Sequence, residues 1–218
     1  MTVWHICNLD VFEIFEKQMF LNCGTLNNKL FHDPDGGSCQ TIKDCYDYMS
    51  YRLLKKCPEK PAHALDYPVW VWYKYACDSN KRMPPLKSED NPDINDQVRI
   101  TLDIPDNLVL LSDYNLWHIP LNNVFICNSK EDDAYLTNNV YQNILENRYP
   151  MTLERFRELN WELLFHLDRF LCPYWHGRLV NEPDCYGRSI QGVTWVLYWK
   201  YVRKVDILKN VPVLGLSE

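Results

Sequence analysis

The amino-acid sequence predicts an α+β fold: a single domain over residues 1–218 with a mostly antiparallel mixed sheet flanked by helices. Residues 69–73 carry bulky side chains on both faces, which is typical of an inner strand. Residues 132–147 repeat apolar side chains at every fourth position, as an amphipathic helix does. No linker divides the chain and 46% of its residues are hydrophobic, so we exclude disorder and expect a well-filled core.

Short β-type runs and apolar helical stripes alternate in the first half of the chain. Period-two alternation in the run at 69–73 puts the indoles of Trp70 and Trp72 on one face, and Tyr73 falls on the other. The predicted elements are a strand at 3–7, a helix from about 9 to 19 capped by Asn8 or Asp10, a helix from Thr41 through about Lys56, and the strand at 69–73.

The second half begins with a long loop and ends with two strands. Residues 78–96 are rich in proline, asparagine and acidic residues, and a loop of that length is typical of a binding lid or of disorder. Ser112 and Asp113 are good N-cap residues that would start a short helical turn. The other predicted elements are strands at 97–104 and 107–111, a helix at 132–147, a helix from Thr152 towards Leu167 with Trp161 and Glu162 in its middle, and strands at 189–199 and 201–208.

Charge and cysteine usage restrict the classes of function. The formal net charge of -6 at pH 7 argues against broad binding of phosphate backbones. The nine cysteines form no CxxC pair and no apolar targeting or membrane-spanning run occurs, so we expect reduced thiols, a cytoplasmic location and no membrane span. His166, Cys172, His176 and Cys185 are residue types that zinc accepts, but they lack the usual paired spacing. We expect no metal, although binding at Cys172, His176 and Cys185 stays open.

Several residues are candidates for a functional site, each with a structural alternative. His5, on the first strand, either faces a cleft or is a satisfied interior histidine. Arg52 either binds an anionic ligand or pairs on the surface, and Trp72 either floors a cleft for a planar ring or belongs to the core. Asp113 and His118 either form an acid–base pair on adjacent turns, or Asp113 caps a turn that holds a core indole.

Four stretches carry a family resemblance. YPVWVWY, VLLSDYNLWHIPLN, NWELLF and IQGVTWVLYWKYVRKV occur in an order and spacing that resemble a bacterial and phage family known as domain of unknown function 3841. The resemblance covers most of the chain. The opening VWHI departs from the Trp-Thr-x-Gln type of start associated with the family. The family itself implies no activity.

A second resemblance concerns the order of the elements. A first strand with His5, a helix, a Gly24-x-Leu26 corner, a middle aromatic strand and a late strand that opens with Gln191 are similar to the layout of ADP-ribosyltransferase folds. The resemblance implies NAD as co-substrate, with its ribose held by His5 and Gln191 beside the reacting carbon. A carboxylate would stabilise the oxocarbenium character better than the amide of Gln191, which cannot act as a general base.

The same resemblance suggests roles for the remaining candidates. Trp72 or Tyr73 would stack on nicotinamide, Arg52 and Trp117 would complete the cofactor-binding set, and Asp113 or His118 would supply an acid–base group. We expect one wall of a cleft from residues 113, 117 and 118 and the other from residues 5, 72 and 191.

Two other functions stay open at this point. The chain could be a non-catalytic binding module of phage or defence origin, or a nucleic-acid-processing protein. No Walker A loop, GxSxG nucleophile elbow or GxGxxG dinucleotide motif occurs, so we exclude an ATPase, a serine hydrolase and a Rossmann dehydrogenase.

Overall fold

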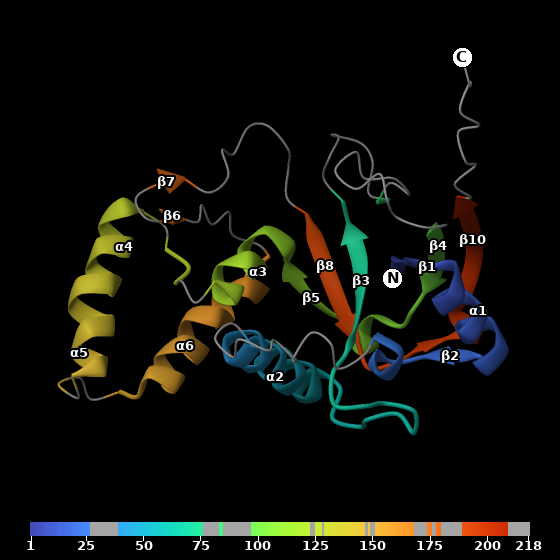
Figure 1. Cartoon of the computed structure of the whole chain (residues 1–218), viewed down its shortest axis with the longest axis horizontal. Coiled ribbons are helices and arrows are strands. Elements are labelled where there is room, and N and C mark those ends of the chain that lie inside the picture. Colours follow the sequence, from blue (N-terminus) through green and yellow to red (C-terminus); the bar gives the residue numbers. More distant parts are fainter. Residues whose placement is uncertain are drawn as a thin grey trace, which may run out of the picture.

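The computed structural model describes residues 1–26, 39–75, 83–84, 97–122, 125–127, 129–146, 148, 151–167, 174–175, 178–179 and 189–208. Most of the predicted loop at 78–96 lies outside these residues, as do Cys172, His176 and Cys185. The described elements form an α+β fold, as the sequence predicts (Figure 1).

Six strands form an antiparallel sheet in the order β10-β4-β1-β3-β8-β5, and every pairing in it is antiparallel. Two two-stranded sheets, β2-β9 and β6-β7, accompany it. The strands are β1 Thr2–Asn8, β2 Phe20–Leu21, β3 Val69–Lys74, β4 Gln97–Asp103, β5 Leu110–Asp113, β6 Tyr174–Trp175, β7 Arg178–Leu179, β8 Ile190–Thr194, β9 Leu197–Tyr198 and β10 Val202–Leu208.

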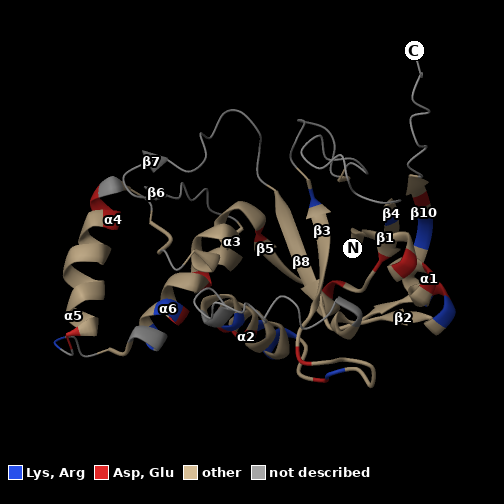
Figure 2. Ribbon diagram, viewed as in Figure 1, with Lys and Arg blue, Asp and Glu red and all other residues tan. Residues whose placement is uncertain are grey.

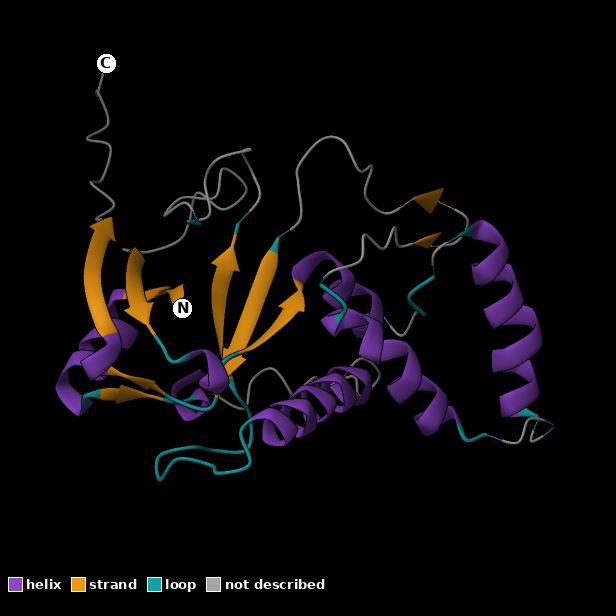
Figure 3. Ribbon diagram, turned by 180° about the vertical axis from the view of Figure 1, so that it is seen from behind, coloured by secondary structure: helices purple, strands orange, loops and turns teal. Residues whose placement is uncertain are grey.

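Helices gather near the two ends of this sheet. In the views from both sides, α2, α3 and α6 lie near β5, and α1 lies near β4 and β10 (Figures 1 and 3). The segment from α4 to α5 is continued through a π-helical turn at Leu136–Tyr141. The helices are α1 Leu9–Gln18, α2 Cys39–Lys56, α3 Tyr114–Leu121, α4 Lys130–Tyr135, α5 Gln142–Leu145 and α6 Leu153–Trp161.

Strand β3 is the inner strand that the alternation at 69–73 predicts. Val69 and Val71 are buried in a cluster formed with β1, β4 and α1. Trp70 packs on the opposite face against a second cluster that includes residues of α2, α3 and β8. Since both faces are covered, a one-residue slip of β3 would exchange the two sets of side chains, and the register is therefore strongly specified.

The sheet opens between β1 and β3. β1 pairs with β4 along its whole length, from Thr2 to Asn8, but with β3 only at Trp4 opposite Trp72. Beyond that pair, Trp70 offers its carbonyl oxygen to the side chain of His5 at 2.9 Å. A side chain has thus replaced a backbone donor at the point where the ladder ends.

Some predicted boundaries and positions are wrong. Residues 106–108 form a 3₁₀ turn, so the strand expected at 107–111 begins at Leu110. Helix α6 begins after its cap Thr152 but ends at Trp161, and Glu162 starts a 3₁₀ turn rather than standing in mid-helix. Helix α1 ends at Gln18, and Met19, the last residue of the predicted helix, is its exposed C-cap with φ 66°.

Charged residues are sparse on the inner strands. Figure 2 shows β8 without Lys, Arg, Asp or Glu and β3 with a single basic end, which is Lys74.

Among the described helices, none is long and apolar enough to cross a membrane.

We expect Gly192→Ala to destabilise the fold, because a Cβ at Gly192 would lie 2.8 Å from Val109 and 3.1 Å from Leu111 inside the core. Overpacking of this kind costs about 1–3 kcal/mol of unfolding free energy, measurable by urea denaturation. Gly24→Ala is the matched control: its Cβ would meet mainly the side chain of Leu65, which is 44% exposed and can move. Equal losses in the two variants would contradict this packing.

Candidate functional site

A row of four residues crosses β1, β3, β8 and the edge strand β5 on one face of the sheet. Trp4 on β1 pairs with Trp72 on β3, Trp72 with Gln191 on β8, and Gln191 with Ser112 on β5. Direct cross-strand partners point to the same face, so these side chains are neighbours. The row brings together two of the predicted site residues, Trp72 and Gln191, from positions more than a hundred residues apart in the sequence.

Two members of this row are buried polar residues with unused hydrogen-bonding groups. Gln191 is 6% exposed and its Nε2 has no hydrogen-bond partner; Ser112 is 0% exposed and its Oγ has none either. Leaving such a group buried and unpartnered costs about 1–3 kcal/mol. Native proteins rarely keep that cost without a reason, and a ligand that supplies the partner is one such reason.

His5, on the strand on the other side of β3, is a third buried polar residue, but as the neighbour of Trp4 its side chain starts from the opposite face of the sheet. Its Nδ1 lies 2.9 Å from the carbonyl oxygen of Trp70, which only accepts, so Nδ1 carries the proton. Burial lowers the pKa of His5 below its usual value, which keeps the ring neutral. The other nitrogen, Nε2, is buried without a partner and is therefore a lone-pair acceptor available to a ligand hydroxyl.

Tyr114 is the aromatic neighbour of this row that the sequence did not single out. Its ring centroid lies 4.7 Å from that of Trp72 and 4.8 Å from that of His118, so the three rings form a continuous aromatic edge. Tyr114 is the first residue of α3, and its backbone N–H donates to Ser189 beside the start of β8. The position of Tyr114 follows from the pairing of residues 110–113 with β8, and the sequence alone does not show that pairing.

Asp113 caps helix α3, which was the structural alternative for this residue. Its Oδ1 accepts a hydrogen bond of 3.0 Å from the backbone N–H of Leu116. Partial burial alone lowers the pKa of His118, whereas a carboxylate partner would raise it. The geometry therefore gives no support to an Asp113–His118 acid–base pair. His118 instead contacts the ring of Tyr114, which in turn contacts Trp72.

Trp117 and Tyr73 do not join the row. Trp117 is 5% exposed and packs against Trp70, with ring centroids 5.1 Å apart, and against Tyr46. Tyr73 lies on the opposite face of β3 from Trp72 and packs against the other core cluster. The expected wall of residues 113, 117 and 118 is thus divided between a cap, a core indole and a surface ring.

Arg52 braces two helical segments. Its Nη1 forms an ion pair with Oε1 of Glu162, and its guanidinium lies 4.7 Å from the centroid of the Phe165 ring. The hydroxyl of Tyr48 lies 3.0 Å from the same Glu162 oxygen. These contacts join α2 to the 3₁₀ turn after α6, so the pairing alternative accounts for Arg52, although its Nε remains buried without a partner.

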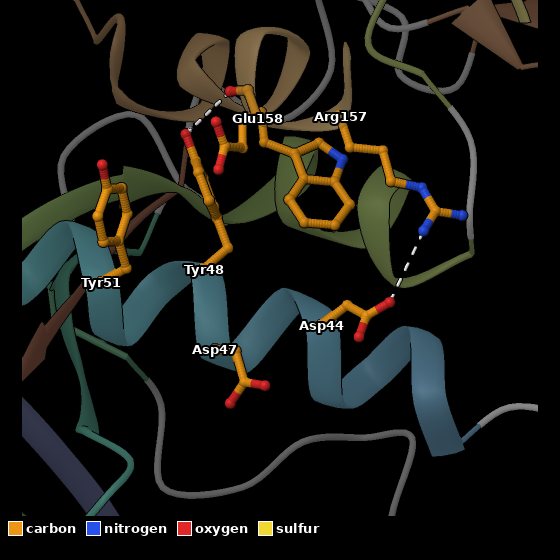
Figure 4. A pocket seen from close by; sticks show the side chains of 7 residues that line it. Asp44, Asp47, Tyr48, Tyr51, Arg157 and Glu158 are labelled. Atoms are coloured by element: carbon orange, nitrogen blue, oxygen red, sulfur yellow. Dashed lines mark hydrogen bonds and ion pairs between the residues drawn. The ribbon is translucent and has the colours of Figure 1, made fainter. Parts of the chain in front are cut away.

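A separate cavity of about 510 Å³ lies between α2 and α6 (Figure 4). Three aromatic rings and four charged groups form its lining. The lining residues are Asp44, Asp47, Tyr48, Tyr51, Arg157, Glu158 and Trp161.

Each carboxylate of this cavity lies near a basic side chain. Asp47 pairs with Lys43 on the same helix, Glu158 pairs with Arg155, and both pairs are solvent-exposed. Asp44 lies 3.7 Å from Arg157 across the cavity. Exposed pairs such as Asp47–Lys43 and Glu158–Arg155 contribute about 0–1 kcal/mol each.

Metal binding receives no support from the described part of the chain. No group of three or more His, Cys, Asp or Glu side chains there is arranged to hold a metal ion. His166 is described, but the other residues considered for zinc, Cys172, His176 and Cys185, are not.

The fold and the row together define a class: an α+β domain with a six-stranded antiparallel sheet whose inner strands carry buried, unsatisfied polar groups. A family model described as "Domain of unknown function (DUF3841)" matches residues 2–202, and the chain belongs to this family. The match spans all four strands of the row. No curated protein and no solved structure matches the chain.

Acid should destabilise the protein partly through His5. Because burial lowers the folded-state pKa of His5, its contribution to stability is present above pH about 6.5 and is lost as the pH falls. One such histidine adds up to about 1.4 kcal/mol per pH unit to the slope of unfolding free energy.

Denaturant unfolding between pH 7.5 and 5.5 would measure that slope, and we expect it to be shallower in His5→Asn than in the natural protein. The control is His118→Asn, which removes an imidazole that remains solvent-accessible and should change the slope less. Identical slopes in His5→Asn and the natural protein would show that His5 is not held neutral by the fold.

Proposed function

We propose that this chain is an NAD-dependent ADP-ribosyltransferase-like enzyme that acts on a macromolecular acceptor, either a protein or a nucleic acid. One observation carries the proposal: Gln191 on β8 is buried, keeps an unpartnered nitrogen and is the cross-strand partner of Trp72, which offers an aromatic ring on β3. His5 on β1 is also buried with an unpartnered nitrogen, and its ring lies at the opening between β1 and β3. These are the residues to which the layout resemblance gives ribose, nicotinamide and anomeric-carbon contacts.

Each side chain suits a part of that chemistry. His5 Nε2, a neutral acceptor, would receive a hydrogen bond from a ribose hydroxyl. The exposed part of the Trp72–Tyr114 edge would contact the planar nicotinamide ring, and the Gln191 amide would lie beside the ribose. Burial strengthens these interactions because little water competes for the same groups.

The transfer needs one bond to break and one to form. The bond between the nicotinamide nitrogen and the ribose carbon breaks with its electron pair on nicotinamide, a lone pair of the acceptor forms the new bond, and the acceptor proton passes to water. This chain's contribution would be to hold the ribose and to stabilise positive charge at its carbon with the Gln191 dipole. His118, an exposed imidazole in contact with Tyr114, would relay that proton to water.

A cytoplasmic location is part of this proposal. Five of the described cysteines, residues 7, 23, 45, 57 and 127, are free thiols. Burial raises the pKa of Cys7, Cys45 and Cys127 to about 12, so these thiols stay protonated and unreactive. Such cysteines fit a reducing compartment.

Incubation with NAD labelled in its adenosine part, with cell lysate as acceptor, tests the activity. We expect nicotinamide release and label transfer, and a rise in melting temperature with NAD. Gln191→Ala should slow nicotinamide release at least about tenfold, because it removes the dipole beside the ribose. Gln142→Ala, an exposed position on α5, is the control. The absence of release, transfer and thermal shift in the natural protein would refute the transferase.

A second candidate function, a non-catalytic binding module, is favoured by the cavity between α2 and α6. Its three carboxylates outnumber its one arginine, and Tyr51 is 46% exposed at its edge. Acidic groups beside aromatic rings suit a lysine or arginine side chain of a basic partner.

Fluorescence polarisation with labelled oligolysine and oligoglutamate peptides distinguishes this candidate. We expect oligolysine to bind, oligoglutamate not to bind, and Tyr51→Ala to weaken binding about fivefold through loss of a cation–π contact. Tyr135→Ala, which removes an exposed tyrosine on α4, should have no effect. Equal binding of both peptides would refute the module, and salt-dependent retention on DNA or RNA would instead support a nucleic-acid-processing protein.

A further inference from the structure

Ser112 is the buried polar residue of the row to which the proposed reaction gives no role. Its side chain is completely buried on β5, and Oγ has no hydrogen-bond partner. Gln191, its cross-strand partner on β8, is in the same condition at Nε2. A hydroxyl that can accept and an amide that can donate therefore lie side by side on one face of the sheet, and each lacks what the other offers.

The register determines how closely the two side chains approach. The N–H of Tyr114 donates to the carbonyl of Ser189 at 3.1 Å, one hydrogen-bonded pair further along the same two strands. Hydrogen-bonded pairs recur every second residue in an antiparallel ladder, so Ser112 and Gln191 form such a pair, with Cβ atoms about 5.5 Å apart. A change in side-chain torsions alone would bring Nε2 to Oγ.

We propose that Ser112 is a positioning residue for Gln191, an inference that rests on the proposed function. The Ser112 hydroxyl oxygen accepts a hydrogen bond from Gln191 Nε2–H. Because the two ends of a primary amide point in different directions, anchoring Nε2 towards β5 turns Oε1 towards β3, where Trp72 lies on the same face. The carbonyl oxygen, not the NH₂ group, then faces the ribose.

This orientation answers the objection that Gln191 is an amide where a carboxylate would serve better. Only the oxygen end of the amide dipole stabilises an oxocarbenium-like carbon, and the NH₂ end would oppose it. A freely rotating amide would present both ends. Ser112 selects the useful end without touching the substrate.

Nicotinamide release by three single variants tests the role. Ser112→Ala should lower kcat about tenfold with little change in KM, because it removes an orientation that matters in the transition state. Ser112→Thr keeps the hydroxyl and should retain most of the activity. Ser50→Ala is the matched control, since it removes another buried, unpartnered hydroxyl, on α2. Full kcat in Ser112→Ala would overturn the inference while the transferase stands.

A readout without turnover separates this inference from the proposed function. In ¹H–¹⁵N spectra with and without NAD, one Gln191 amide proton should be shifted downfield and protected from exchange, and Ser112→Ala should abolish that protection. The signals are assigned by their loss in Gln191→Glu. If Ser112→Ala abolishes the protection but the natural protein does not react with NAD, the transferase is refuted and the role of Ser112 stands. Unchanged Gln191 signals in Ser112→Ala in both conditions would overturn the role of Ser112.

Discussion

The structure depends on β3 being held on all four sides. β1 and β8 pair with its two edges, one core cluster packs on Val69 and Val71, and the other packs on Trp70. A shift of one residue would place valines where indoles fit, so the register cannot drift. The alignment of Trp72 with Gln191 follows from this constraint and needs no polar contact to maintain it.

The apolar surroundings give the polar groups their importance. His5, Ser112 and Gln191 would each find water if they were exposed, whereas in the sheet each keeps an unpartnered atom. The open pairing of β1 with β3 provides the local reason for His5: its ring takes the carbonyl that the ladder leaves free, and its second nitrogen stays buried without a partner. Packing thus leaves unsatisfied polar atoms on β1, β8 and β5; a ribose hydroxyl would satisfy His5, and Ser112 and Gln191 would satisfy each other.

Local sequence patterns predicted most elements but not their assembly. The alternation at Trp70 and Trp72 identified the inner strand, and Asp113 was recognised as a good N-cap residue. The roles of Tyr114 and Ser112 could not be predicted, because both arise from the pairing of β5 with β8 across about eighty residues, and pairing partners leave no mark in a single strand. The partners of Arg52 could not be predicted either, because Glu162 and Phe165 come close to it only through the packing of α2 against the 3₁₀ turn after α6.

A crystal structure of the protein with NAD is the most direct test of the central claim. We expect the nicotinamide ribose at the opening between β1 and β3, with a hydroxyl within about 3.2 Å of His5 Nε2, the nicotinamide ring against Trp72 or Tyr114, and the Gln191 carbonyl oxygen turned towards the ribose. NAD bound only in the cavity between α2 and α6, or His5 and Gln191 still without ligand partners when NAD is bound elsewhere, would contradict the account.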